Sequence, residues 1–428
     1  MTHELVIRNV RLADGSAPRD IFVDGGKISA ITLFDADAEI SAERIVDGRG
    51  RFALPGFIDL HVHFRDPGFT YKEDILSGSR CAAAGGVTSV FCMPNTMPVC
   101  DTPEVVGYIL EKARRADCRV FPVGAITKGL GSHEICDYSV LKKAGAAAFS
   151  DDGKPVADAA VLLEAMRAAK REDVLFLSHC EDMSLSGGAM NEGAVSERLG
   201  VKGVPSAAED IGTLRDIAVA EYTGSRLHIC HVSTRGSVEA VRQAKRRGVN
   251  VSAETCPHYF AFTEEDVPRL GTMGKMSPPL RTRADVDAII EGLADGTIDC
   301  ISTDHAPHSD EEKSRGLEAA PNGIIGLQTS FAASYTYLVK PGHITLERLS
   351  ELMSGAPARI SGLDRNGLGR LAEGCPADIA IVSTGKENVL DRADLRGKSS
   401  NSPFIGVPLY AAVERTFVGG REVFTREK

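Results

Sequence analysis

Two histidines and an arginine stand at alternate positions in residues 59–68, which read Asp-Leu-His-Val-His-Phe-Arg-Asp-Pro-Gly. The apolar residues just before them have the composition of a buried strand. Because side chains alternate between the two faces of a strand, His61, His63 and Arg65 are expected to project to the same side. Paired imidazoles suit a bound metal. The segment therefore predicts a metal site with a fixed positive charge beside it.

The length and charge of the chain limit what else it can do. Its 428 residues suffice for one large barrel or a few ordinary domains. The net charge of -10 is spread along the chain, which argues against binding to nucleic acid or to an anionic membrane. No apolar run has transmembrane length, and the N-terminal residues lack the features of a signal peptide. The ten cysteines show no C-x-x-C spacing, which favours a reducing cytoplasm.

A repeated unit must position the histidines. Short runs rich in β-branched residues are each followed by a polar cluster and then by a stretch with helical spacing. These runs lie at residues 57–60, 87–93, 119–123, 146–150, 174–178, 227–230, 249–253 and 298–303. The pattern predicts a (β/α)8 barrel of the TIM type, in which all strand ends converge on one site. A doubly wound sheet is the alternative, but it does not explain why polar residues recur at so many strand ends.

The two ends of the chain predict a second, smaller unit. Residues 21–28 and 416–423 both have the pattern of a hairpin with two glycines at its turn. Neither terminal segment could bury a good core alone. We therefore expect one small β-sandwich domain built from residues 1–53 and 364–428, flanking a barrel of residues 54–363. The helical segment 346–363 is expected to connect barrel and sandwich.

Further candidate ligands follow the later strands. Asp151 and Asp152 follow the fourth run, His179 the fifth, His231 the sixth and Asp304 the eighth. With His61 and His63 they suffice for two divalent ions with room for solvent, as in an open catalytic zinc site. Such a pair of metals can share a carboxylate and a hydroxide, which is a nucleophile at neutral pH. Asp151 lies nearer its strand than Asp152 and is the expected bridge. Strand parity favours His231 as a ligand and places His228 against a helix.

Several segments in sequence order resemble class I dihydroorotases of the amidohydrolase superfamily across nearly the whole chain. They are residues 61–68 (HVHFRDPG), 93–96 (MPNT), 149–156 (FSDDGKPV), 179–182 (HCED), 231–234 (HVST), 303–308 (TDHAPH) and 374–379 (GCPADI). The resemblance implies that His61, His63 and Asp304 hold one zinc ion and that His179 and His231 hold a second. Asp151 and a hydroxide would bridge the two ions.

The resemblance also implies a binding site for a substrate carboxylate. Arg65, Asn95 and His308 would contact it, since an arginine with two neutral donors makes a suitable anion clamp. The implied substrate contacts further include His63, Ser277, Asn322 and Gly323. Ser277 stands where the family often has asparagine. Asn322 stands where an aromatic residue is common, and the Pro-Asn-Gly sequence there is typical of dihydropyrimidinases.

The reaction implied is the reversible cyclisation of N-carbamoyl-L-aspartate to L-dihydroorotate and water in pyrimidine biosynthesis. Asp304 is expected to carry the proton between the attacking water and the ring nitrogen. Another cyclic amidohydrolase, such as a hydantoinase, dihydropyrimidinase or allantoinase, is the alternative. A dihydroorotase-like protein without catalysis, bound to aspartate transcarbamoylase, is a second alternative that the complete set of ligands disfavours. A homodimer and an aspartate transcarbamoylase partner are both left open by the sequence.

Overall fold

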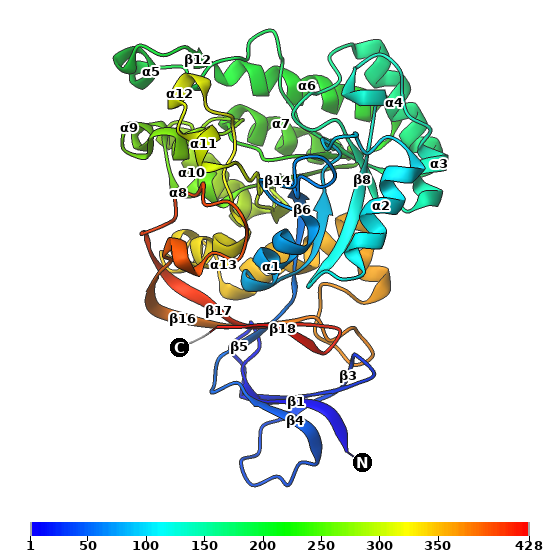
Figure 1. The fold of residues 1–428 in the computed structure, drawn as a ribbon, viewed down its shortest axis with the longest axis vertical. Coiled ribbons are helices and arrows are strands. Elements are labelled where there is room, and N and C mark those ends of the chain that lie inside the picture. Colours follow the sequence, from blue (N-terminus) through cyan, green and yellow to red (C-terminus); the bar gives the residue numbers. More distant parts are fainter. Residues whose placement is uncertain (1, 427–428) are drawn as a thin grey trace.

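The computed structural model describes residues 2–426. A barrel surrounded by helices occupies one end of the molecule, and two stacked sheets built from the chain termini occupy the other (Figure 1). The barrel and the terminal sheets confirm the fold predicted from the sequence. Within residues 2–426, no helix combines the length and the apolar character needed to cross a membrane.

Eight parallel strands form the barrel sheet, and each overlaps one of the runs identified in the sequence. In chain order they are β6 (Phe57–Val62), β7 (Val87–Cys92), β8 (Arg119–Ala125), β9 (Ala148–Ser150), β10 (Leu175–Ser178), β13 (Arg226–Ile229), β14 (Val251–Thr255) and β15 (Cys300–Ile301). Neighbours in space are neighbours in this order, from β6 to β15. The simple order is that of successive right-handed β-α units.

The first and last strands meet through a few contacts that close the barrel. The His63 amide donates a hydrogen bond to the His305 carbonyl (2.8 Å), and Val62 and His305 form a parallel bridge. Inside, side chains such as Ile58, Phe91 and Leu177 pack into one buried cluster. The interior is therefore a packed core that supports the strand ends from below.

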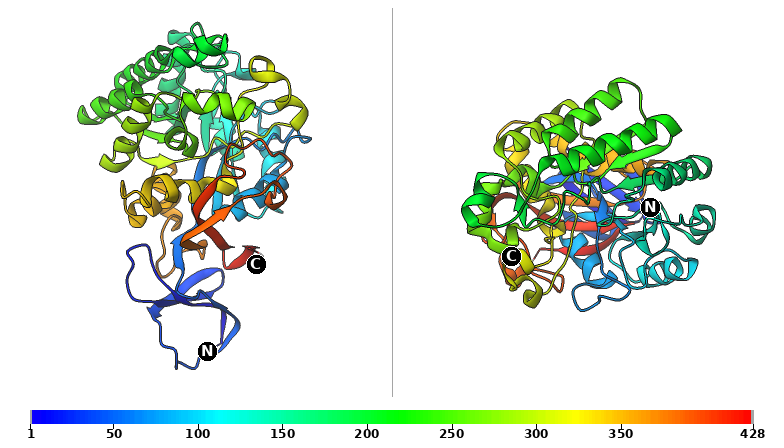
Figure 2. Two further views of the ribbon diagram at one scale, coloured as in Figure 1. Left: turned by 90° about the vertical axis from the view of Figure 1, so that its left-hand side faces the viewer. Right: turned by 90° about the horizontal axis from the view of Figure 1, so that it is seen from above.

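Helices follow the strands and cover the outside of the barrel (Figures 1 and 2). The longer ones are α1 (Ile75–Ala84), α2 (Pro103–Ala113), α3 (Tyr138–Ala144), α4 (Ala159–Glu172), α6 (Ser206–Thr223), α7 (Arg235–Arg246) and α10 (Arg283–Asp295). Their ends carry the expected signals. Asp158 accepts hydrogen bonds from the first turn of α4, and Thr282 and Asp285 form a capping box at α10.

Shorter elements occur in the loops above the strand ends and after β15. They are β11 (Met190–Asn191), α5 (Ala194–Leu199), β12 (Gly203–Val204), α8 (Pro257–Ala261), α9 (Val267–Leu270), α11 (Asp310–Lys313), α12 (Gly316–Ala319) and α13 (Ser330–Ser334). The segment predicted to connect barrel and sandwich is helical, as α14 (Leu346–Ser350), a π-helical turn and α15 (Ala356–Ser361). Ala358 of α15 joins the packed interior of the barrel.

The terminal segments form two four-stranded sheets. The first contains only N-terminal strands: β1 (His3–Val10), β2 (Arg19–Asp24), β3 (Lys27–Leu33) and β4 (Ala42–Asp47). The second combines both ends of the chain: β5 (Phe52–Pro55), β16 (Ile379–Val389), β17 (Pro408–Val418) and β18 (Arg421–Thr425). Both predicted hairpins are present, with glycines at positive φ at each turn. The domain boundaries at residues 53 and 363 stay a prediction, although β5 continues past the first of them.

The first four residues of strand β16, Ile379–Val382, are buried on both faces because they lie between the first sheet and the barrel. Ile379 and Ile381 pack with residues of the first sheet, such as Ile7 and Ile21. Ala380 and Val382 belong instead to the core that includes Phe57 of the barrel. The alternation of side chains thus lets one strand join the two parts of the molecule.

Replacing Ile381 with alanine should lower the free energy of unfolding by about 2–5 kcal/mol, because it opens a cavity in the shared core. The Ile381 side chain is 1% exposed. Leu33→Ala is the matched control on strand β3, where the side chain is 64% exposed, and it should change stability by less than about 0.5 kcal/mol. Urea denaturation of both variants measures the difference. Equal effects would show that the two sheets do not share a core.

Candidate functional site

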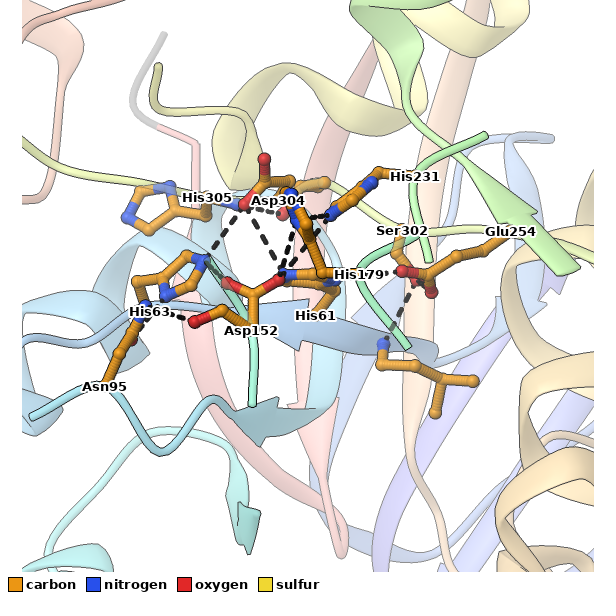
Figure 3. A network of polar contacts seen from close by, with 12 residues as sticks. His61, His63, Asn95, Asp152, His179, His231, Glu254, Ser302, Asp304 and His305 are labelled. Carbon is orange, nitrogen blue, oxygen red and sulfur yellow. Dashed lines mark hydrogen bonds and ion pairs between the residues drawn. The ribbon is translucent and has the colours of Figure 1, made fainter. Parts of the chain in front are cut away.

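A cavity of about 370 Å³ opens at the carboxyl ends of the barrel strands. All seven residues predicted to contact substrate line it: His63, Arg65, Asn95, Ser277, His308, Asn322 and Gly323. His179, His231 and Asp304 line it too, while His61 lies fully buried beneath them. The predicted residues therefore come together at one mouth, as Figure 3 shows for the central ones.

His61, His63 and Asp304 form the first group that could hold a metal. Their ligand atoms all lie within 4.8 Å of one another. Oδ1 of Asp304 is 3.0 Å from Nε2 of His63 and 3.5 Å from Nε2 of His61. Burial alone would raise the pKa of Asp304, but the hydrogen bond from His63 and the nearby histidine charges lower it to about 2. The Asp304 carboxylate is thus ionised at neutral pH.

Asp152 is the acidic residue at the centre of the histidine cluster. Its Oδ1 lies 3.3 Å from Nε2 of His61 and 3.5 Å from both Nδ1 of His179 and Nε2 of His231. Its Oδ2 lies 3.4 Å from Nε2 of His63. One carboxylate therefore contacts all four histidines, as a bridge between two metal positions requires (Figure 3).

Asp151 does not occupy the bridging position predicted for it. Its side chain accepts hydrogen bonds from the amides of Ile126 (2.8 Å) and Thr127 (3.1 Å) and from the Thr127 hydroxyl. Burial raises its pKa to about 6 in spite of these bonds. The prediction counted distance from the strand, whereas strand β9 ends at Ser150 and the Asp151 side chain bonds to the loop that follows β8. The structure therefore contradicts the position predicted for Asp151, and it is Asp152 that faces the four histidines.

His179 and His231 form the second group. Nδ1 of His179 is 2.9 Å from Nε2 of His231, and both atoms face Asp152. Nε2 of His179 lies 3.1 Å from Glu181, a carboxylate that can accept the proton on that nitrogen. This arrangement leaves Nδ1 of His179 free to bind a metal. Glu181 lies in the segment that carries the family resemblance, but its role was not predicted.

Glu254 fixes the orientation of His61 from inside the barrel. Its Oε1 is 3.1 Å from Nδ1 of His61, so Nε2 of that ring points into the site. Its Oε2 lies 3.2 Å from Nε2 of His228 and accepts a hydrogen bond from Ser302. Glu254 was not predicted, although a glutamate within an otherwise apolar or small-residue strand could have indicated it.

His228 lies inside the barrel and not against a helix. Besides Glu254, it contacts Ser252, whose hydroxyl is 2.8 Å from Nδ1. The parity argument failed because His231 adopts a φ of +37°, which breaks the alternation after β13. His228 and His231 can therefore both face inward although they stand three residues apart.

Backbone strain occurs at three of the site residues. Arg65, His231 and Asp304 have φ values of +60°, +37° and +47°. Such values are costly for residues with a Cβ and persist only where the surrounding structure imposes them. Here each turns a side chain into the mouth at the point where its strand ends.

Positive charge gathers on one wall of the cavity. The half-buried Arg65 donates a hydrogen bond from Nε to the Pro307 carbonyl (3.3 Å), and Lys72 Nζ lies 3.3 Å from Nδ1 of His308. Burial, then the charges of Arg65 and Lys72, lower the pKa of His308 to about 3, which leaves its ring neutral at physiological pH. A neutral Nε2 can then donate to the Asn322 carbonyl, 2.8 Å away. In this structure His308 therefore supports Asn322.

Asn95 lies between the histidine cluster and the positive wall. Its Oδ1 is 2.9 Å from Nδ1 of His63, an arrangement that directs Nε2 of that ring into the site. Its amide nitrogen makes only a long contact with the Asp152 carbonyl, at 3.5 Å. That nitrogen is thus free to serve as a donor to a ligand in the cavity.

The donor set fits a pair of metal ions. Nε2 of His61 and Oδ1 of Asp152 are buried and have no hydrogen-bond partner among the described residues. Burying such atoms without a partner is unfavourable, which a cation between them would correct. The converging ligands are imidazole nitrogens and carboxylate oxygens, the set that divalent zinc accepts.

Comparison with known proteins agrees with the geometry. A family described as dihydro-orotase-like matches residues 50–237. A dihydroorotase of Acetivibrio thermocellus is 49% identical over 411 residues, which cover 96% of this chain and 95% of the relative. A dihydroorotase of Ruminiclostridium cellulolyticum is 45% identical over 428 residues, which cover 99% of each chain.

Among solved structures, an L-hydantoinase of Arthrobacter aurescens superposes with a TM-score of 0.87 at 28% identity. The match covers all of this chain and 97% of that one. The barrel and terminal sheets are therefore common to cyclic amidohydrolases, whereas sequence identity is much higher to the dihydroorotases. On these grounds the chain belongs to the dihydroorotase family.

Proposed function

We propose that the cavity is the active site of a dihydroorotase, which interconverts N-carbamoyl-L-aspartate and L-dihydroorotate. The observation that carries this proposal is the position of Arg65, a half-buried guanidinium on the wall beside the histidine and aspartate cluster. Dihydroorotate carries a carboxylate outside its ring, next to the amide that is hydrolysed. Arg65 with the free amide of Asn95 can bind that carboxylate while the ring amide faces Asp304.

A hydantoinase or dihydropyrimidinase is the second candidate, because a protein of that description shares the whole fold. The Pro321-Asn322-Gly323 sequence also has the dihydropyrimidinase pattern. Their ring substrates lack a carboxylate at that position, however, and would cover Arg65 without supplying a counter-ion. Burying an unpaired guanidinium against a neutral ligand is unfavourable. The charge of the wall thus favours dihydroorotate.

Two zinc ions, held by His61, His63, Asp304, His179 and His231 with Asp152 between them, are part of the proposal. Bound there, they would supply a hydroxide nucleophile at neutral pH and polarise the amide carbonyl. Asp304 then serves as the proton carrier. It takes the proton of the attacking hydroxide and passes it to the ring nitrogen as the carbon–nitrogen bond breaks. Its ionised state at neutral pH suits the first of these steps.

The cellular setting is also proposed. All ten cysteines are free and buried, in keeping with a reducing cytoplasm. A second copy of the chain and an aspartate transcarbamoylase remain the partners that the sequence leaves open. The wall residues belong to one chain, so the site as proposed needs neither partner for substrate binding.

Substrate choice is tested with purified enzyme and four compounds: dihydroorotate, dihydrouracil, hydantoin and allantoin. We expect turnover of dihydroorotate to exceed that of the others by at least about 100-fold in kcat/KM, since the others lack the carboxylate that pairs with Arg65. Arg65→Met should remove most of this preference by raising KM for dihydroorotate. Activity confined to dihydrouracil would refute the assignment of substrate.

The bridging position is tested with two neighbouring aspartates. Asp152→Asn should lose at least one of two bound zinc equivalents, because it removes a charged oxygen facing four histidines. Asp151→Asn is the matched control. It should keep both equivalents and lower thermal stability, since it disturbs the buried contacts with Thr127. Elemental analysis of both proteins gives the metal content, and loss of metal from only the Asp151 variant would reverse the assignment.

The proton carrier is tested with Asp304→Asn, which keeps the size of the side chain. We expect kcat to fall by about 10²- to 10⁴-fold, the usual contribution of a positioned acid and base. Metal content is measured in the same preparation, so that loss of a ligand is distinguished from loss of the carrier. A variant with full metal and near-normal kcat would exclude Asp304 from this role.

A further inference from the structure

Lys313 is a buried lysine below the positive wall of the cavity. It ends the short helix α11 and is 2% exposed. Within residues 2–426, its hydrogen-bond acceptors are all backbone carbonyls: those of Lys275 (3.3 Å), Pro321 (3.1 Å) and Gly323 (3.0 Å). Three acceptors match the three N–H donors of an ammonium group.

The buried position of the Lys313 side chain is unfavourable for a charged group. Burial, and to a smaller extent the charge of Lys275, lower the pKa of Lys313 to about 7. An apolar side chain of similar length would fill the space without that cost. A buried lysine whose described contacts are carbonyl oxygens therefore suggests that fixing the position of those peptide groups serves the function of the protein.

The carbonyls belong to two neighbouring segments that both lead into the lining of the cavity. Lys275 precedes Met276 and Ser277, whereas Pro321 precedes Asn322 and Gly323. The two segments also meet directly, since the Gly323 amide donates to the Lys275 carbonyl at 3.0 Å. Lys313 thus joins both segments from behind.

Gly323 shows how closely this wall is fitted. A Cβ on Gly323, at its φ of +121°, would lie 2.6 Å from the Cβ of Ala306. Its carbonyl also accepts a hydrogen bond from Asn401 at 3.1 Å. The same asparagine accepts the His308 amide at 3.1 Å. The wall is therefore fixed at its peptide groups, and the Lys313 side-chain nitrogen contacts three of them.

We propose that Lys313 is a positioning residue for substrate binding, which locks residues 321–323 against the Lys275–Ser277 side of the cavity. The inference rests on the proposed function, because it assumes that Ser277, Asn322 and Gly323 contact the substrate. Lys313 itself does not line the cavity. Its effect on the reaction passes through the wall that it holds.

Lys313→Met tests the proposal in the full-length, metal-loaded enzyme. We expect KM for dihydroorotate to rise by about tenfold or more, while kcat stays within about threefold, because the lost contacts hold the binding wall and not the reacting groups. Zinc content should be unchanged. Lys245→Met is the matched control, because this half-buried lysine of α7 does not line the cavity and donates to the Gly296 carbonyl at 3.0 Å and to Asp299 at 2.7 Å. Its KM should stay within about twofold of the parent value.

Three results would overturn the inference: an unchanged KM in folded Lys313→Met, an equal rise in Lys245→Met, or a fall in kcat alone. If Lys313→Met does not fold, Lys313→Gln decides, since it keeps N–H donors without the charge. It should raise KM about threefold or more, and a KM within about twofold of the parent would contradict the proposal. An unaltered enzyme without dihydroorotase activity would instead refute the proposed function, which distinguishes the two failures.

Discussion

The rest of the site depends on burying ionised carboxylates among imidazoles at the mouth of a closed barrel. Asp152, Asp304 and Glu254 are nearly or fully inaccessible to solvent, and an isolated buried carboxylate would be strongly destabilising. Each is compensated by histidines, and burial is outweighed so that the pKa of all three falls below its usual range. The cluster thus holds negative charge where a pair of cations would be bound most strongly.

Two carboxylates, outside the centre of the cluster, orient the imidazole rings. Glu254 orients His61 and Glu181 orients His179, so each metal-facing nitrogen is selected by a hydrogen bond on the opposite side of its ring. The backbone also pays for the arrangement, with positive φ at His231 and Asp304. A barrel can support such local strain because its packed interior, below the mouth, does not move with it.

The sequence was sufficient to predict the repeating architecture. It was not sufficient to predict which side chains at the strand ends face the site. Eight runs and two terminal hairpins follow from periodicity and glycine turns, which are local properties of the chain. The choice between Asp151 and Asp152 depends instead on which carboxylate the Thr127 loop captures, a contact between segments 24 residues apart. His228 was misplaced for a related reason, because one residue of positive φ changes the alternation on which the argument relied. The contacts of Glu254 and Lys313 were not predicted, because the groups that they bind come from other parts of the chain.

Two sides of the cavity differ in what they can contribute to substrate specificity. On the proposed function, the histidine and aspartate side would carry out chemistry that any cyclic amide can undergo, in keeping with the similar fold of a hydantoinase. The opposite side carries Arg65 and Lys72, whose charges keep His308 neutral and leave its ring to support Asn322. A carboxylated ring satisfies the positive charge of this wall, whereas a neutral ring would bury it unpaired. On the proposed function, the substrate would be selected by the free-energy cost of leaving Arg65 without a partner, which requires that the wall keep its position when a neutral ring binds.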